Sequence, residues 1–145
     1  MRNGKIQIGL MGLGQIGRHL YQLAAESDDL EIVAVADIGK PEILHYLLKS
    51  DTAGAPPCEL QDNYLVNEKF RTRMLQSAKP GDVPWDVFGV DCVIDATGRY
   101  RRREYLETHL QSGAGRVILA SLPAESIDRV LVPGIHQVPA PTRTP

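Results

Sequence analysis

The sequence predicts an α/β fold, a single domain built on a doubly wound, mainly parallel β-sheet of about six strands. Two observations lead to this prediction. Apolar runs of strand length alternate with segments of helical spacing along most of the chain. The first such unit reads strand, helix, strand, which implies parallel pairing and a right-handed crossover. The length of 145 residues and the 43% hydrophobic composition suit one globular domain.

The opening unit is the most regular part of the pattern. Residues 5–10 alternate between polar and apolar side chains and predict a strand. Residues 30–36 are rich in β-branched side chains and predict a second strand that leads to Asp37. Between them, apolar residues recur at the spacing of a helix: Ile16, Leu20, Leu23 and Ala24.

The middle of the chain is less regular. Pro41 suits the first turn of a short helix, which the Gly and Pro residues of 54–57 would end. Residues 58–61, 64–66 and 69–76 predict small antiparallel strands or hairpins.

The α/β pattern returns in the last third of the chain. The expected elements are a strand, a helix, a second strand and a possible third strand: residues 91–96, 101–112, 116–120 and 128–132. Prolines are frequent after this point and disfavour regular structure. We therefore expect one domain of residues 1–137, followed by a Pro-rich tail of residues 138–145.

Composition and charge exclude several classes of function. The net charge is −2, so no basic field would attract a nucleic acid. No run of about 18 apolar residues exists, so we expect no membrane span, and the N-terminus lacks the apolar segment of an export signal. Cys58 and Cys92 have no close Cys or His partners, which argues against a metal site or a disulfide framework. The reducing cytoplasm is the expected location.

Three glycines, Gly12, Gly14 and Gly17, have the spacing G-x-G-x-x-G between the first predicted strand and the first predicted helix. Asp37 follows Gly17 by 20 positions, at the end of the second strand. Together these features are the fingerprint of a Rossmann-type dinucleotide-binding domain. The glycines would permit a tight turn, a close approach to a pyrophosphate and close helix–strand packing, and the helix N-terminus favours an anion.

Asp37 predicts the choice of cofactor. A carboxylate at this position accepts hydrogen bonds from the adenine-ribose hydroxyls of NAD and repels the 2′-phosphate of NADP. The alternative is that the glycines only serve a tight turn and that Asp37 caps the next helix. That alternative explains neither the third glycine nor the spacing to the carboxylate, so NAD binding is the favoured interpretation.

Five segments extend the pattern beyond this fingerprint: residues 5–18, 44–52, 83–85, 89–98 and 113–119. In sequence and in order they resemble the N-terminal NAD-binding domain of the glyceraldehyde-3-phosphate dehydrogenase family, over roughly residues 5–137. The resemblance implies an oxidoreductase of glycolysis that uses NAD. Erythrose-4-phosphate dehydrogenases share the layout, so the substrate stays open between the two.

The resemblance also implies which residues contact NAD. They would contact, in order, the pyrophosphate, the adenine ribose, the adenine, the middle of the cofactor and the nicotinamide end: Gly12, Gly14, Gln15, Ile16 and Gly17; Asp37; Ser77 and Ala78; Ala96, Thr97 and Gly98; and Ala120 or Ser121.

The sequence departs from the family at several points. Met11 and His136 stand where the family usually has Asn, and Gln15 stands where it usually has Arg. The family's Ser-Asn-Ala-Ser-Cys-Thr-Thr-Asn segment, which holds the nucleophilic cysteine, would follow residue 137 and is not in this sequence. We therefore expect no catalytic residue in these 145 residues, with the catalytic domain absent. Neither Cys58 nor Cys92 is expected to replace the nucleophile, because neither has a cationic neighbour in the sequence.

Two interpretations of the function stay open. The chain is either part of a full dehydrogenase or a free-standing NAD-binding module with a regulatory or structural role. A weaker third possibility is a relative that kept only the fold. Besides NAD, the expected partners are its own catalytic domain or further copies of the chain.

Two groups of residues outside the fingerprint also need an interpretation. The histidines His19, His45, His109 and His136 lack the spacing of metal ligands, and we expect surface or packing roles for them. An arginine cluster comprises Arg99, Arg101, Arg102 and Arg103. It is expected to be a solvated face with Arg103–Glu107 and Arg101–Glu104 pairs, and the alternative is a site for an anion or a partner protein.

Overall fold

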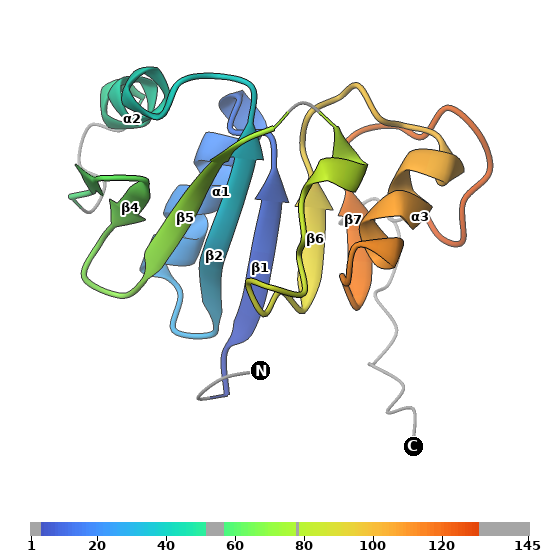
Figure 1. Cartoon of the computed structure of the whole chain (residues 1–145), viewed down its shortest axis with the longest axis horizontal. Coiled ribbons are helices and arrows are strands. Elements are labelled where there is room, and N and C mark those ends of the chain that lie inside the picture. Colours follow the sequence, from blue (N-terminus) through green and yellow to red (C-terminus); the bar gives the residue numbers. More distant parts are fainter. Residues whose placement is uncertain (1–3, 52–56, 78, 131–145) are drawn as a thin grey trace.

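The computed structural model describes residues 4–51, 57–77 and 79–130, and its core is a seven-stranded sheet (Figure 1). The strands are β1 (Ile6–Met11), β2 (Leu30–Asp37), β3 (Glu59–Gln61), β4 (Tyr64–Val66), β5 (Arg71–Gln76), β6 (Cys92–Asp95) and β7 (Arg116–Leu119). The helices are α1 (Gln15–Glu26), α2 (Pro41–Ser50), the short 3₁₀ helix η1 (Pro80–Asp82) and α3 (Arg103–Gln111).

The sheet order is β3-β4-β5-β2-β1-β6-β7, and this arrangement confirms the predicted doubly wound architecture. The strands from β5 to β7 are all parallel, with β1 paired to both β2 and β6. After β1 the chain places β2 to β5 on one side of β1, and it then returns to place β6 and β7 on the other side. The carboxyl ends of β1, β2 and β6 meet at one edge, which is where ligands bind in this architecture.

Two strand predictions need correction. The segment expected to form only a small hairpin includes β5, which pairs antiparallel with β4 on one side and parallel with β2 on the other. Residues 69–76, the third of the small strands that were predicted, therefore join the main sheet through β5. The sheet has seven strands, one more than the six predicted. Residues 128–130 form no strand, and the remainder of the expected last strand and the Pro-rich tail 138–145 lie outside the described residues.

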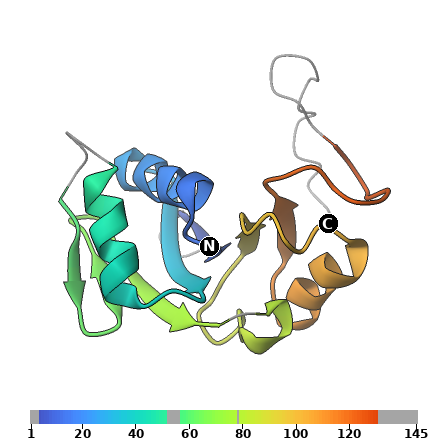
Figure 2. The same ribbon diagram turned by 90° about the horizontal axis from the view of Figure 1, so that it is seen from above.

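The two faces of the sheet carry separate apolar cores. Figure 2 shows α1 and α2 on one side and η1 and α3 on the other. The first core contains Leu10 and Val35, which alternate along β1 and β2 with Met11, Ala34 and Ala36 of the second core. The second core surrounds Trp85, which is fully buried and lies against Gly9 so closely that a Cβ there would come within 2.7 Å of the indole ring.

The arginine cluster is arranged differently from the prediction. Helix α3 begins at Arg103, whose guanidinium Nη1 lies 2.9 Å from a carboxylate oxygen of Asp128 rather than pairing with Glu107. The Arg101 guanidinium donates to the carbonyl of Leu122 at 3.3 Å. These two arginines therefore hold the segment after β7 against the start of α3. Because the Arg103–Asp128 pair is solvent-exposed, water and salt screen the attraction between its charges, and its contribution to stability is small.

Candidate cofactor-binding site

The glycine loop starts with a backbone conformation that disfavours other residues. Gly12 follows β1 with φ +94°, and a Cβ at this position would lie 3.1 Å from both the Cγ2 and the backbone nitrogen of Thr97. Its N–H donates to the carbonyl of Ala36 on β2 at 2.8 Å. Gly12 therefore lets the chain turn tightly between the carboxyl ends of β2 and β6.

Gly17 brings the first helix onto this turn. A Cβ at Gly17 would lie 2.2 Å from the carbonyl oxygen of Gly12, which no real side chain tolerates. Gly17 is buried in the first turns of α1, so its glycine identity is required by helix–loop packing. The fold alone explains Gly12 and Gly17.

Gly14 differs from both, because nothing in the chain requires a glycine there. Its φ of −79° suits any residue, and an added Cβ would have no heavy atom within 4 Å. It is the N-cap of α1 and provides no side-chain cap, and the first turn carries no acidic residue. The N–H groups of this turn have no acceptor within the helix and lie at its positive dipole end. The open space at Gly14 therefore faces donors that suit an anion.

Asp37 is tied to the same loop from the end of β2. Its Oδ2 accepts the backbone N–H of Leu13 at 2.7 Å and its Oδ1 accepts that of Gly39 at 2.8 Å. The alternative, that Asp37 caps the next helix, does not hold: the N-cap of α2 is Lys40, and no side chain caps it. A carboxylate has about four acceptor positions, so the half-buried Asp37 keeps capacity for the two hydroxyls of a ribose.

The expected adenine contacts lie partly outside the described residues. Ser77 follows β5, and its N–H donates to the backbone carbonyl of Asp37 at 3.1 Å, so its backbone lies directly beside that of Asp37. Ala78 lies outside the described residues.

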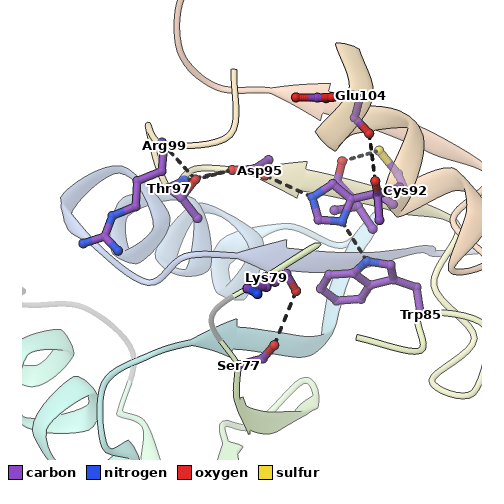
Figure 3. Close-up of polar contacts among 11 residues, drawn as sticks. Ser77, Lys79, Trp85, Cys92, Asp95, Thr97, Arg99 and Glu104 are labelled. Carbon is purple, nitrogen blue, oxygen red and sulfur yellow. Dashed lines mark hydrogen bonds and ion pairs between the residues drawn. The ribbon is translucent and has the colours of Figure 1, made fainter. Parts of the chain in front are cut away.

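Ala96, Thr97 and Gly98 follow β6, and the first two lie next to Gly12 of the glycine loop. Figure 3 shows Thr97 beside Asp95. The Ala96 N–H donates to the carbonyl of Met11 at 2.7 Å. The N–H and the hydroxyl of Thr97 donate to Oδ1 of Asp95, at 3.1 and 2.7 Å. Gly98 is exposed, has φ +69° and would meet no atom if it carried a Cβ. These residues line the same sheet edge as the loop at Gly12.

Ala120 and Ser121 come directly after β7 at this edge. The N–H of Ala120 donates to the carbonyl of Asp95 at 3.0 Å. The hydroxyl oxygen of Ser121 is buried and has no hydrogen-bond partner among the described residues. The structure thus brings the predicted site residues that it describes to one edge, from Ser77 at one end to Ser121 at the other.

A cavity of about 570 Å³ lies beside α1. Its lining residues are Gln15, Ile16, Arg18, His19, Leu20, Gln22 and Asp51, so it shares only Gln15 and Ile16 with the predicted site. Arg18 and Asp51, which form an ion pair, both line it, whereas Gly12, Gly14, Gly17 and Asp37 do not.

The two thiols are poor nucleophiles in this fold. Burial raises the pKa of the Cys58 thiol, which lies 3.3 Å from the hydroxyl of Tyr21. Burial also raises the pKa of Cys92 on β6. A nucleophilic thiol needs a lowered pKa, so neither cysteine has the environment of an activated one. Within the described ranges no three His, Cys, Asp or Glu side chains group as metal ligands, and no helix is long and apolar enough to cross a membrane.

One polar group near the site was not predicted as part of it. His109 on α3 is fully buried and lies between the Trp85 indole and the Asp95 carboxylate, at 3.0 Å from each. It bonds to the carboxylate that holds Thr97. A surface or packing role was expected for this histidine, and its neighbours in the sequence give no sign of the two hydrogen bonds.

Comparison with known proteins agrees with this geometry. Residues 6–103 match the family model described as the NAD-binding domain of glyceraldehyde 3-phosphate dehydrogenase. The chain is 35% identical over 136 residues to glyceraldehyde-3-phosphate dehydrogenase of Geobacillus stearothermophilus and 36% identical over 137 residues to that of Streptomyces coelicolor. Both alignments cover 91% of this chain, but the chain spans only 40% of the length of each relative. The chain therefore belongs to the glyceraldehyde-3-phosphate dehydrogenase family, and the part that it shares with the family is the NAD-binding domain.

Proposed function

We propose that the chain binds NAD along the carboxyl edge of the sheet, as the cofactor-binding part of a phosphorylating glyceraldehyde-3-phosphate dehydrogenase of the cytoplasm. The observation that carries this proposal is Gly14. Its glycine identity has no cause in the fold, whereas a pyrophosphate against the first turn of α1 would need the space that a side chain would fill.

The remaining contacts follow the edge of the sheet. In the proposed pose the pyrophosphate lies at the glycine loop, the adenine ribose at Asp37, the adenine at Ser77 and Ala78, the middle of the cofactor at Ala96, Thr97 and Gly98, and the nicotinamide end at Ala120 or Ser121. Gln15 and Ile16 are exposed in the first turn and offer their backbone N–H groups. We take residues 1–137 as the extent of this domain.

NAD, when bound, supplies the hydride acceptor for oxidation of an aldehyde. The residues of this chain bind and orient it: Asp37 accepts the ribose hydroxyls and the start of α1 stabilises the phosphate charge. Burial raises the pKa of both thiols above the ordinary value. Cys58 directly precedes β3, and Cys92 lies within β6. We therefore propose that the 145 residues alone do not carry out the oxidation.

A free-standing NAD-binding module is the second candidate. Met11, which stands where the family usually has Asn, is buried in the core beside Trp85, and Gln15 brings no cation to the phosphates. Both departures from the usual family residues are those expected of a family member that has diverged from the others. The reading frame beyond Pro145 separates the candidates: an in-frame Ser-Cys-Thr-Thr-Asn supports the dehydrogenase, and an immediate stop codon supports the module.

The test of NAD binding uses Gly14→Ser. Serine is a good N-cap and its Cβ meets no atom, so the variant should unfold at the same or a higher temperature than the unmodified chain. Its side chain would occupy the proposed phosphate position, so NAD affinity measured by calorimetry should fall by about tenfold or more. Gly81→Ser, on η1, is the control outside the glycine loop: its Cβ would lie 3.1 Å from Cγ2 of Thr108, and the folded variant should bind NAD normally. Undiminished affinity in Gly14→Ser would contradict the proposed pose.

A further inference from the structure

A fully buried chain of hydrogen bonds leads from the core to the proposed cofactor site. Trp85, His109 and Asp95 are each 0% exposed and come from the loop before β6, from α3 and from the end of β6. The Trp85 Nε1 lies 3.0 Å from Nδ1 of His109, and Nε2 of His109 lies 3.0 Å from Oδ2 of Asp95. Figure 3 shows Trp85, Asp95 and Thr97 along this line.

The partners fix the position of the proton on His109. An indole N–H can only donate, so Nδ1 of His109 must be the acceptor and carry no proton. The neutral ring then has its proton on Nε2, which donates to Asp95. A doubly protonated ring would place an N–H against the N–H of Trp85, so the contact with Asp95 is a hydrogen bond from a neutral imidazole to the carboxylate rather than an ion pair.

Asp95 connects His109 to the proposed site through hydrogen bonds to Thr97. One carboxylate oxygen is held by His109, and the other accepts both the N–H and the hydroxyl of Thr97, at 3.1 and 2.7 Å. The Thr97 hydroxyl in turn accepts the N–H of Arg99 at 3.1 Å. The carboxylate cannot rotate without losing a partner on one side. Its buried charge has three donors, so its position is determined by this network.

We propose that His109 is a positioning residue of the cofactor site, which acts through Asp95 to hold Thr97 and Gly98 in place for the middle of NAD. This inference rests on the proposed NAD binding. Packing alone does not require the arrangement, because three apolar side chains would fill the same volume without burying polar groups. Thr97 is the residue of this network that lies beside Gly12 at the sheet edge.

The hydrogen bonds of His109 should affect binding of only one half of the cofactor. Loss of the histidine would release Asp95 and loosen Thr97 and Gly98, which belong to the middle of the proposed site. Asp37 and Ser77 hold the adenine half and do not contact this chain of hydrogen bonds. A change at His109 should therefore weaken NAD, whereas AMP, which carries only the adenine half, should bind as before.

The experiment compares NAD and AMP by calorimetric titration of the full chain. His109→Phe keeps a ring but neither hydrogen bond, and it should lower NAD affinity by about tenfold without changing AMP affinity. His109→Gln keeps one donor and one acceptor and should recover most of the NAD affinity. Thr72→Val is the control, because it removes another fully buried hydrogen bond, to the Ile32 carbonyl, far from Thr97 in the sheet. It should destabilise the fold and leave both affinities unchanged.

Two further measurements keep the inference testable if His109→Phe does not fold. Trp85→Phe removes the indole donor, together with part of the ring volume in the core, and should lower NAD affinity in the same selective way. The ¹⁵N NMR shifts of the His109 ring in the unmodified chain should show a proton on Nε2 and none on Nδ1. A proton on Nδ1, or equal loss of NAD and AMP in the folded variants, would overturn the role of His109. So would unchanged NAD affinity in both Phe variants. Failure of the unmodified chain to bind NAD would instead refute the proposed function.

Discussion

The carboxylate of Asp37 accepts the backbone N–H of Leu13 at 2.7 Å, so the acidic residue that the sequence places 20 positions after the glycine loop is joined directly to that loop. This contact gives Asp37 two tasks. It orders the turn that precedes α1, and its remaining acceptor positions face the proposed ribose. A change at Asp37 should therefore affect both loop stability and cofactor choice, and the two effects can be separated by the choice of substitution.

The first prediction concerns cofactor choice. Asp37→Asn keeps an acceptor for the Leu13 N–H but removes the charge that would repel a 2′-phosphate. We expect Asp37→Asn to bind NADP more tightly than the unmodified chain does. Asp37→Ala should bind NAD more weakly than the unmodified chain. Calorimetry with both cofactors measures this. Equal NAD and NADP affinity in the unmodified chain would contradict the assignment, and Lys40, three residues later, would then be the first alternative contact to test.

Gly17 gives a second prediction, on stability. Its added Cβ would lie 2.2 Å from the Gly12 carbonyl oxygen, so Gly17→Ala must push α1 away from the loop. We expect a loss of about 3 kcal/mol or more in the free energy of unfolding, measured by urea denaturation. Gly14→Ala, in the same loop, has open space around its Cβ and should lose far less. Similar losses in both variants would show that the helix does not pack on the loop as described.

The sequence predicted the part of the site that depends on local geometry. A strand, a turn and a helix set the spacing of Gly12, Gly14 and Gly17, and a carboxylate after the next parallel strand must come to the same sheet edge. The contacts of His109 could not be predicted in this way, because Trp85 and Asp95 meet it only when α3 packs against the sheet. No local spacing encodes such a contact. The parallel pairing of β5 was missed for the same reason, since it depends on a neighbour distant in sequence, β2.

A third prediction concerns the thiols at high pH. Burial raises the pKa of Cys58 and Cys92 above their ordinary value of 9.0, so the folded chain retains these protons when the unfolded chain has lost them. The stability that they contribute is present below pH 9 and is lost as the pH rises further. We expect the free energy of unfolding to fall above about pH 9. Cys58→Ala should make that fall shallower, and an unchanged slope would show that Cys58 does not contribute.

A fourth prediction concerns Gln15. Gln15→Arg adds a cation to the exposed first turn of α1 and should tighten NAD binding by no more than about fivefold, because a solvent-exposed charge contact is weak. The gain should shrink at high salt and be the same for ADP-ribose, which carries the same pyrophosphate. Titration with both ligands at low and high ionic strength measures it. Unchanged affinity at low salt would mean that residue 15 does not face the phosphates.

The last prediction tests the proton on His109 through stability alone, without a ligand. Asp95→Asn replaces an acceptor with a group that has both a donor and an acceptor. If its oxygen keeps the bonds from Thr97, its NH₂ faces Nε2 of His109, which must then give up its proton. The neutral ring would carry that proton on Nδ1, where it meets the N–H of Trp85. Either proton position leaves two donors facing each other in a buried site.

Trp85→Phe removes one of those two donors. We therefore expect Asp95→Asn and Trp85→Phe together to cost less free energy of unfolding than the sum of their separate costs, by about 0.5–3 kcal/mol. Urea denaturation of the four proteins in this cycle measures the difference. Thr72→Val combined with Asp95→Asn is the control pair, because Thr72 lies on β5 and Asp95 on β6, with β2 and β1 between them in the sheet. The effect of Thr72→Val, which removes the bond to the Ile32 carbonyl, should therefore add to that of Asp95→Asn. Additive costs for Trp85 and Asp95 would mean that the two residues do not act on one proton of His109.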